Sequence, residues 1–266
     1  MRAKDADAPA PRLPGGYCND TVRVDDTVVK RFTGPGAELR RDTEGRALKA
    51  AAGTVPVPRV LRTGGAELVC QFVDGTHGQR LLNPERAAGI LAECGRVLAA
   101  LHTVSVAPLG GADGSPKVLV HGDYGPQNLL LDEETLRVTA VLDWEWSHIG
   151  RPIEDLAWCE WIVRTHHADC VDALPHLFHG YGTPPAPWPK RQEAMLAKCR
   201  AMRRFGAARR DGSAALWRRR TAVTSSWAVL SHSVGAAHSG LECGGDALDQ
   251  QGGLVTDQAE VAAGAG

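Results

Sequence analysis

The sequence predicts an α+β fold with two lobes: a small, β-rich lobe over residues 15–73 and a larger, mostly helical lobe over residues 74–235. Short runs of β-branched residues separated by turn residues fill the first segment. Helical spacing of apolar residues dominates the second. Residues 1–14 are rich in Ala, Pro and Asp and are expected to form a flexible arm, and residues 236–266 a disordered tail. The 266 residues suffice for two lobes that share a cleft.

A hairpin, a helix and two further strands account for the N-terminal lobe. Residues 21–24 and 27–32 are β-rich runs on either side of an Asp-Asp turn, which predicts a hairpin. Residues 38–52 have the composition of a helix. Strands are expected over residues 55–61 and 66–73, and the prolines of the first confine it to a sheet edge.

An amphipathic helix and several short strands begin the C-terminal lobe. Asn83 as N-cap and Pro84 at the first helical position predict a helix that runs to about His102. Its apolar stripe has helical spacing and consists of Ile90, Leu91, Cys94, Val97, Leu98 and Leu101. Three strands are expected next, over residues 118–120, 129–131 and 138–142. From Glu154 onward the pattern is helical.

Composition and charge indicate an ordinary globular protein. Hydrophobic residues make up 43% of the chain and charged residues 23%. The formal net charge of -1 gives no general argument for binding nucleic acid or an anionic membrane. No apolar run reaches the roughly 18–20 residues that span a bilayer, and the N-terminus has no apolar core of a secretory signal. A cytoplasmic protein with no membrane partner is therefore expected.

The cysteines agree with a reducing compartment. The seven are Cys18, Cys70, Cys94, Cys159, Cys170, Cys199 and Cys243. Their number is odd, their spacings are long and no C-x-x-C occurs, so neither a disulfide framework nor a zinc site is expected. They are interpreted as small packing residues.

Residues 118–146, VLVHGDYGPQNLLLDEETLRVTAVLDWEW, combine apolar strands with polar residues at a defined spacing. An H-G-D triplet ends at Asp123, Asn128 follows five residues later, and a pair of apolar runs leads to Asp143. Phosphoryl transfer needs a carboxylate beside the acceptor hydroxyl and oxygen ligands for magnesium on the phosphates. This spacing lets one loop and one strand end converge on a magnesium nucleotide. The alternative is that these residues only cap turns of a hairpin.

This stretch resembles the catalytic core of the aminoglycoside phosphotransferase-like family, which includes choline kinase-like enzymes and is related to protein kinases. The family pattern is H-G-D-x-x-x-x-N, then D-W/F, then G-x-P-x-x-D. Residues 121–128, Asp143-Trp144 and residues 150–155 match it, although Arg151 stands where the family usually has Asp. The resemblance implies a two-lobed, protein-kinase-like fold.

The resemblance also implies roles for individual residues. Asp123 would be the catalytic base, and Asn128 and Asp143 would be magnesium ligands. Asp155 would bind backbone groups near the catalytic loop. ATP and Mg²⁺ are the implied cofactors.

Further positions match the nucleotide-binding half of the family. Lys30 lies on the strand whose lysine contacts the α- and β-phosphates, and Glu44 of the next helix is its expected ion-pair partner, with Glu38 as the competing candidate. Gly16 lies where a phosphate-covering loop is expected, but the usual G-x-G-x-x-G is absent.

The strand that ends before Asp74-Gly75 resembles the hinge between the lobes. Backbone groups of Gln71 and Val73 are expected to bind adenine there.

The segment after Asp143 is too short for a regulated protein kinase. Only eleven residues separate Asp143 from Asp155, and Gly122 replaces the arginine that would bind an activation-loop phosphate. These features favour a constitutively assembled enzyme with a small acceptor.

The implied activity is transfer of the ATP γ-phosphate to a hydroxyl group of a small molecule, such as an aminoglycoside or another antibiotic. Metabolite acceptors such as homoserine, choline or a sugar are one alternative, and a catalytically silent nucleotide-binding protein is another. A nucleic-acid-binding protein that uses the basic residues 190–220 is a third, and no nucleic-acid partner is expected.

Two segments bear on the acceptor. Residues 154–172 carry five carboxylates that could attract a polycationic sugar, or could be an ordinary solvated helix face. Residues 190–220 carry 11 Lys and Arg and could face an anionic acceptor, or could also be solvated. Four tryptophans, Trp144, Trp146, Trp158 and Trp161, could stack on a ring, but core packing is expected for most of them.

Overall fold

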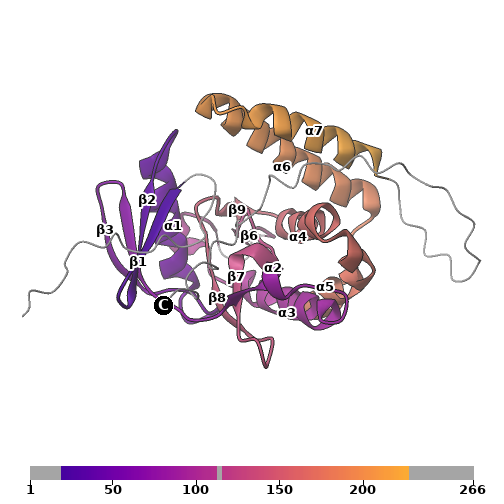
Figure 1. Ribbon diagram of the computed structural model, residues 1–266, viewed down its shortest axis with the longest axis horizontal. Coiled ribbons are helices and arrows are strands. Elements are labelled where there is room, and N and C mark those ends of the chain that lie inside the picture. The colour runs from indigo at the N-terminus through magenta and orange to yellow at the C-terminus, as the bar shows by residue number, and fades with distance from the viewer. Residues whose placement is uncertain (1–18, 113–115, 228–266) are drawn as a thin grey trace, which may run out of the picture. The chain divides into compact units, whose positions relative to one another are not determined.

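The computed structural model describes residues 19–112 and 116–227, and it separates a β-sheet near the N-terminus from a mostly helical remainder (Figure 1). This arrangement confirms the predicted α+β class. The arm at residues 1–14 and the tail at residues 236–266 lie outside the described residues. The boundary between the two lobes stays a prediction.

A four-stranded antiparallel sheet backed by one helix forms the N-terminal part. In the order β1-β2-β4-β3, the strands are β1 (Asn19–Val24), β2 (Thr27–Phe32), β4 (Glu67–Gln71) and β3 (Val60–Gly64). Helix α1 (Ala37–Ala51) buries Ala47 and Leu48 in one core with Leu68 of β4. The predicted hairpin, the helix and the strand at Glu67–Gln71 are confirmed.

Strand β3 lies at the sheet edge as predicted, but it begins at Val60 instead of Val55. Proline has no amide hydrogen, so Pro56 and Pro58 cannot donate to a sheet ladder. The Pro56 carbonyl instead accepts a hydrogen bond from the Val141 amide at 2.9 Å. The proline segment therefore connects the sheet to the strand that leads to Asp143.

Short strands flank the loop that contains the H-G-D triplet. One antiparallel sheet contains β5 (Thr76–His77), β7 (Leu129–Leu131) and β8 (Val138–Val141). A second antiparallel sheet contains β6 (Val118–Val120) and β9 (His148–Gly150). Three of them confirm the strands predicted around the H-G-D triplet. The turn η2 (Pro126–Asn128) leads into β7 and presents Asn128.

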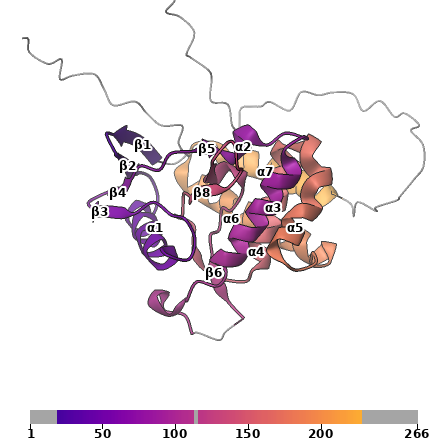
Figure 2. The same ribbon diagram turned by 90° about the horizontal axis from the view of Figure 1, so that it is seen from below.

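The remainder is helical. Its helices are α2 (Gly78–Leu81), α3 (Ala87–Leu101), α4 (Ile153–His166), α5 (Leu174–Tyr181), α6 (Trp188–Arg209) and α7 (Ser213–Ser226), with short turns η1 (Ala107–Leu109) and η3 (Ala168–Ala173). Helices α3 and α5 lie side by side (Figure 2). Gly95 and Gly180 allow this approach, because a Cβ on either would overlap a backbone carbonyl of the other helix. No helix within residues 19–112 and 116–227 is long and apolar enough to span a bilayer.

Helix α3 begins later than predicted. It starts at Ala87, and Asn83 caps the preceding turn, where its Oδ1 accepts a hydrogen bond from the Arg86 amide at 3.0 Å. The predicted apolar stripe is confirmed, since all six of its residues are buried.

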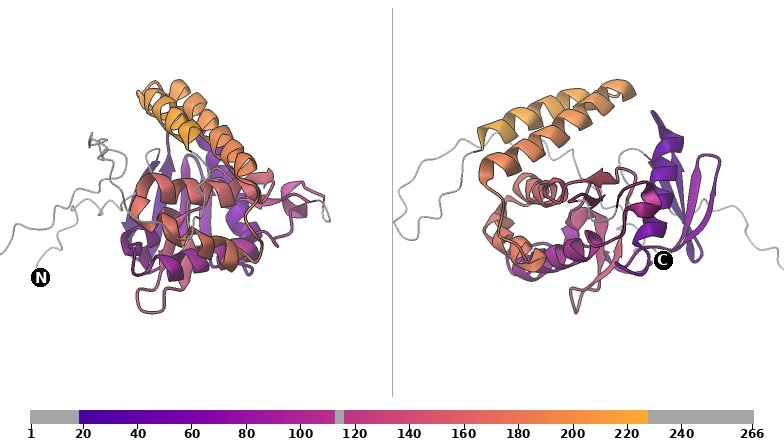
Figure 3. Two further views of the ribbon diagram at one scale, coloured as in Figure 1. Left: turned by 90° about the vertical axis from the view of Figure 1, so that its right-hand side faces the viewer. Right: turned by 180° about the vertical axis from the view of Figure 1, so that it is seen from behind.

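Helices α6 and α7 pack together and lie over α4 (Figure 3). Their contact with α4 forms a cluster separate from the main core, made of Ala157, Trp158, Trp161, Ile162, Trp188, Met195 and Cys199. Trp161 Nε1 also donates to Thr224 Oγ1 at 2.8 Å. Near the other end of α6, the Phe205 ring lies 5.4 Å from the Arg40 guanidinium carbon of α1. Helix α6 therefore spans from the helical part to the N-terminal sheet and its helix.

The cysteines that the structure describes are packing residues, as predicted. Those five are Cys70, Cys94, Cys159, Cys170 and Cys199, all buried and free. Cys18 and Cys243 lie outside the described residues.

Candidate active site

The turn after β6 fixes the protonation of the buried His121. Its Nε2 lies 2.9 Å from the Leu142 carbonyl oxygen, and its Nδ1 lies 3.2 Å from the Asp123 amide nitrogen. An amide only donates and a carbonyl only accepts, so Nε2 carries the proton and Nδ1 accepts. Burial lowers the pKa of His121, which is consistent with a neutral ring. His121 thereby holds the start of the catalytic loop against the strand end that precedes Asp143.

The carboxylate of Asp155, on α4, also holds this turn in place. Its two carboxylate oxygens accept hydrogen bonds from the His121 amide at 2.7 Å and the Gly122 amide at 2.8 Å. Burial alone would raise the pKa of Asp155, but His102 and His121 bring it below its ordinary value. The backbone contacts that the family resemblance implied for Asp155 are present.

Gly122 has a backbone conformation that other residues adopt at a cost. Its φ is 82°, and a Cβ at this position would overlap the Trp146 carbonyl oxygen. A left-handed conformation costs an L-residue roughly 1–2 kcal/mol. The glycine of the H-G-D triplet is thus required by both the backbone angle and the close approach of Trp146.

Gly122→Ala is expected to reduce the free energy of unfolding by more than the backbone angle alone accounts for, because the new methyl group must displace Trp146. The matched control is Gly182→Ala. Gly182 has a φ of 84°, but nothing lies within 4 Å of its missing Cβ. Urea unfolding of both variants measures the difference. Equal losses would show that the Trp146 contact is unimportant.

Asp123 is held by hydrogen bonds from two directions. Its Oδ1 accepts from Trp158 Nε1 at 2.7 Å, and its Oδ2 accepts from Asn128 Nδ2 at 3.1 Å. Burial raises the pKa of Asp123 to about 6, with Lys198 opposing the rise and Asp143 adding to it. A fixed carboxylate with a raised pKa suits a group that orients a hydroxyl and accepts its proton.

Lys30 of β2 joins α1 to the strand end after β8. Its Nζ lies 2.6 Å from Glu44 Oε2 and 2.5 Å from Asp143 Oδ1. Burial alone would lower the pKa of Lys30, but the charges of Asp143 and Glu44 raise it. Of the two candidate partners, Glu44 is buried and paired, whereas Glu38 is exposed.

Asn128 and Asp143 present oxygen atoms of the kind that Mg²⁺ prefers. The Leu142 amide donates to the Asn128 carbonyl at 2.8 Å, which places Asn128 beside the residue that precedes Asp143. Asn128 Nδ2 is engaged with Asp123, so its Oδ1 is the side-chain atom left to contact a cation. Asp143 has a φ of 63°, a left-handed conformation that is uncommon for aspartate and recurs at functional sites. This donor set fits a magnesium ion completed by phosphate oxygens and water.

A second buried ion pair, which the sequence analysis missed, lies beside this group. Arg40 of α1 pairs with Glu145, and Asn19 of β1 donates to the same Glu145 Oε2 at 3.0 Å. Arg40 also donates to the Thr33 carbonyl at 2.5 Å. The pair is separated by 105 positions, and nothing in the spacing of either residue marks the other.

The two residues predicted to bind adenine through their backbones, Gln71 and Val73, differ in whether the amide is already hydrogen-bonded. The Gln71 amide is used within the sheet region, where it donates to the Arg59 carbonyl at 2.9 Å. Within the described residues, the Val73 amide has no hydrogen-bond partner, so it can donate to a ligand. Gly16 lies outside the described residues.

Two of the five carboxylates of residues 154–172 are not on the surface. Asp155 and Glu160 are fully buried, and Glu160 pairs with both Arg164 and Arg191. Glu154 contacts His148 at 3.0 Å. Neither a polycation-binding patch nor a solvated helix face, the two alternatives considered, describes Asp155 and Glu160.

Most of the clustered tryptophans are core residues, as predicted. Trp144 is fully buried and donates to the Val141 carbonyl at 2.9 Å, and Trp158 stacks on Trp161 with ring centroids 4.4 Å apart. Trp146 is only half-buried and lies against Phe205.

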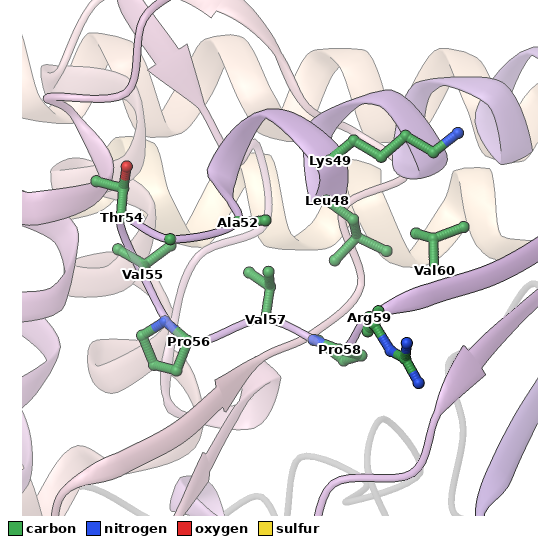
Figure 4. A pocket seen from close by; sticks show the side chains of 11 residues that line it. Leu48, Lys49, Ala52, Thr54, Val55, Pro56, Val57, Pro58, Arg59 and Val60 are labelled. Carbon is green, nitrogen blue, oxygen red and sulfur yellow. The ribbon is translucent and has the colours of Figure 1, made fainter.

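A separate pocket of about 690 Å³ lies at the end of α1 (Figure 4). It is lined by Leu48, Lys49, Ala52, Gly53, Thr54, Val55, Pro56, Val57, Pro58, Arg59 and Val60. None of the residues predicted for phosphoryl transfer contributes to it. The proline segment that delays β3 forms much of its wall.

Curated proteins match a short part of the chain. Acyl-CoA dehydrogenase family member 11 from Homo sapiens is 51% identical over 39 residues, which are 15% of this chain and 5% of that protein. The protein of the same name from Gallus gallus is 44% identical over 46 residues, 17% of this chain and 6% of that protein. The match spans only about a twentieth of the length of these relatives.

Solved structures match most of the chain. The GDP complex of an aminoglycoside 2′-phosphotransferase-IIIa mutant has a TM-score of 0.62 at 14% identity and covers 84% of this chain and 94% of its own. A thermostable aminoglycoside phosphotransferase mutant with ADP and hygromycin B has a TM-score of 0.59 at 17% identity, covering 80% and 92%. A macrolide 2′-phosphotransferase from Brachybacterium faecium has a TM-score of 0.55 at 21% identity, covering 82% and 92%. These likenesses confirm the predicted fold.

The sequence profile of the phosphotransferase enzyme family matches residues 10–115 and 105–194. The two matches together span more than half of the chain, and they include both the Lys30 strand and the H-G-D triplet. The fold and the profile therefore agree, and this chain belongs to the phosphotransferase enzyme family.

Proposed function

We propose that this protein transfers the γ-phosphate of ATP to a hydroxyl group of a small molecule. The observation that carries the proposal is the convergence of Lys30, Glu44 and Asp143 in one ion-pair network. Asp123, the proposed base, is fixed by hydrogen bonds from Asn128 and Trp158. Decay of at least one of these residues is expected in a protein that no longer turns over, and all of them are present.

In the proposed reaction, the acceptor oxygen forms a bond to the γ-phosphorus while the bond from that phosphorus to the β–γ bridging oxygen breaks. ADP leaves with the electron pair of the broken bond, and the hydroxyl proton passes to Asp123. Lys30 steadies the α- and β-phosphates, with Glu44 holding its ammonium group in place. Asn128 and Asp143 would hold Mg²⁺, which neutralises phosphate charge when bound.

The acceptor is a small molecule in this proposal, because the segment between Asp143 and Asp155 contains only β9 and the start of α4. Such a short segment leaves no room for the peptide-binding activation segment of a protein kinase. Antibiotics are one acceptor class, since the structural neighbours include aminoglycoside and macrolide phosphotransferases. A metabolite alcohol is the other. A cytoplasmic location, where ATP is present, is also part of the proposal.

The expected result of a direct assay is ADP release from Mg–ATP that depends on an added acceptor. The panel would hold aminoglycosides, macrolides, choline, homoserine, simple sugars and hydroxy acids, with Asp123→Ala as the blank. A signal in the wild type that is absent in the blank supports the proposal and identifies the acceptor class. Binding of ATP without stimulation by any acceptor would favour the silent nucleotide-binding alternative.

A further inference from the structure

Lys198 of α6 lies beside the catalytic carboxylate. Its Nζ is 4.9 Å from the centroid of the Trp146 ring and 5.7 Å from that of the Trp158 ring. Trp158 is the residue whose Nε1 donates to Asp123 Oδ1. Helix α6 therefore brings a cation near the Trp146 ring and near the Trp158 ring, which contacts Asp123.

Lys198 differs from four cations of the described residues whose side chains have little exposed surface. Lys30, Arg40, Arg164 and Arg191 each have a carboxylate oxygen within 4.0 Å. No carboxylate oxygen lies that close to Lys198 within the described part of the chain. Burial lowers the pKa of Lys198, and the attraction of Asp123 only opposes this effect. Lys198 keeps part of its surface exposed, so a ligand can reach it, and an anionic ligand would supply the close partner that no carboxylate of the described residues provides.

The position of Lys198 favours the acceptor over the nucleotide as that ligand. Asp123 Oδ2 faces Asn128, the proposed magnesium ligand, whereas Oδ1 faces Trp158. Lys198 lies on the Trp158 side. Among the four carboxylates that attract Lys198, Asp123 has the largest effect on its pKa and Asp143 the smallest. The cation is thus more closely associated with the proposed base than with the phosphate-binding group.

Two carboxylates of α4 do not compete for a cationic acceptor. Asp155 and Glu160 are buried and are engaged by backbone amides and by arginines. Trp146 is half-buried and offers an apolar wall beside Lys198.

We propose that Lys198 binds an anionic group of the acceptor, a carboxylate or a phosphate, so that the preferred substrate is a hydroxyl compound carrying an acidic group. This inference rests on the proposed kinase activity. Lys198 is a specificity-determining residue in this reading, because it selects the acceptor without touching the nucleotide.

The test uses acceptors that differ only in charge. One set is mandelate, its methyl ester and 2-amino-1-phenylethanol, and the other is glycerate, glycerol and 3-amino-1,2-propanediol. The full-length protein is assayed for ADP release with each compound. Binding of each compound is also measured by calorimetry in the presence of magnesium and a non-hydrolysable ATP analogue, so that the result does not depend on turnover.

The wild type is expected to favour the anionic member of at least one set. Lys198→Met, which keeps the length and packing of the side chain, should weaken that compound by about tenfold to a hundredfold in KM or Kd, the range for a lost charged hydrogen bond. Binding of the neutral compound should change little. Affinity is the readout, because loss of the Lys198 charge also lets the pKa of Asp123 rise and so alters kcat. Lys198→Glu should shift the preference to the amine. Lys190→Met, at an exposed lysine of the same helix, is the matched control and should resemble the wild type.

Three results would overturn the inference. One is equal or weaker binding of the anionic member in both sets. Another is an unchanged preference in Lys198→Met. The third is an equal loss of affinity for every compound, charged or neutral, which would assign Lys198 to the packing of the site. Failure of the kinase proposal itself would give another result: ADP release would be absent with all compounds although ATP binds.

Discussion

Asp123→Ala is expected to lower acceptor phosphorylation by about 10²–10⁴-fold, the usual contribution of a general base. The binding of Mg–ATP should remain near that of the wild type, because Lys30, Glu44 and Asp143 keep their mutual contacts. Steady-state turnover with the acceptor found in the panel, together with the Kd for Mg–ATP from calorimetry, measures both quantities. Turnover within tenfold of the wild type would remove Asp123 from the role of base.

Asp123→Asn should be as inactive as Asp123→Ala, but it should weaken the binding of Mg–ATP more. Both oxygens of Asp123 accept hydrogen bonds, from Trp158 Nε1 and from Asn128 Nδ2. An asparagine offers one acceptor and one donor group, so its amide nitrogen must face another donor. Rotation of Asn128 would relieve this conflict and withdraw its Oδ1 from the proposed magnesium site. We therefore expect Asp123→Asn to bind Mg–ATP more weakly than Asp123→Ala does.

Arg40→Met is expected to cost about 3–5 kcal/mol of unfolding free energy, the range for removing one partner of a buried ion pair. Arg40 and Glu145 are both about 5% exposed, so the variant leaves a buried carboxylate without its cation. Glu145 lies two residues after Asp143, and Arg40 lies on the helix that carries Glu44. The KM for ATP should therefore rise as well, because the Lys30 network loses support from both sides.

Urea unfolding with Arg31→Met as control separates this effect from that of losing any arginine. Arg31 also pairs with a glutamate, Glu67, but its side chain is 59% exposed, so its loss should shift the unfolding midpoint little. The double variant Arg40→Met/Glu145→Leu should recover most of the lost stability, since it removes both charges. An Arg40→Met midpoint equal to that of Arg31→Met would contradict the assignment.

The sequence predicted the parts of the fold that depend on nearby residues. The hairpin at β1 and β2, the apolar stripe of α3 and the strands around the H-G-D triplet follow from periodicity and turn composition. Errors occurred at boundaries. Pro56 and Pro58 delay β3, and Asn83 caps a turn that precedes α3. Periodicity identifies that an element exists, whereas hydrogen bonds decide the residue at which it begins.

The candidate site shows the same difference between what nearby residues predict and what depends on long-range contacts. Lys30 and Glu44 lie 14 positions apart and could be paired from a known layout. Arg40 and Glu145 could not, because neither belongs to the motif and their contact depends on how the sheet and the helices close on each other. Lys198 was hidden for a different reason. It is one of 11 basic residues in a segment that looks uniformly solvated, and only the packing of α6 on α4 singles it out.

The division of the hydrophobic interior into two clusters has a consequence for how this protein could diversify. The larger cluster supports β2, which carries Lys30, and strands β7 and β8, which follow Asn128 and precede Asp143, whereas the smaller one joins α6 and α7 to α4. Substitutions at sites without shared contacts act nearly independently. If Lys198 selects the acceptor as proposed, variation at Met195 and Cys199 would change the choice of alcohol while Lys30, Glu44 and Asp143 keep their contacts, and Trp158 would be the residue that links the smaller cluster to Asp123.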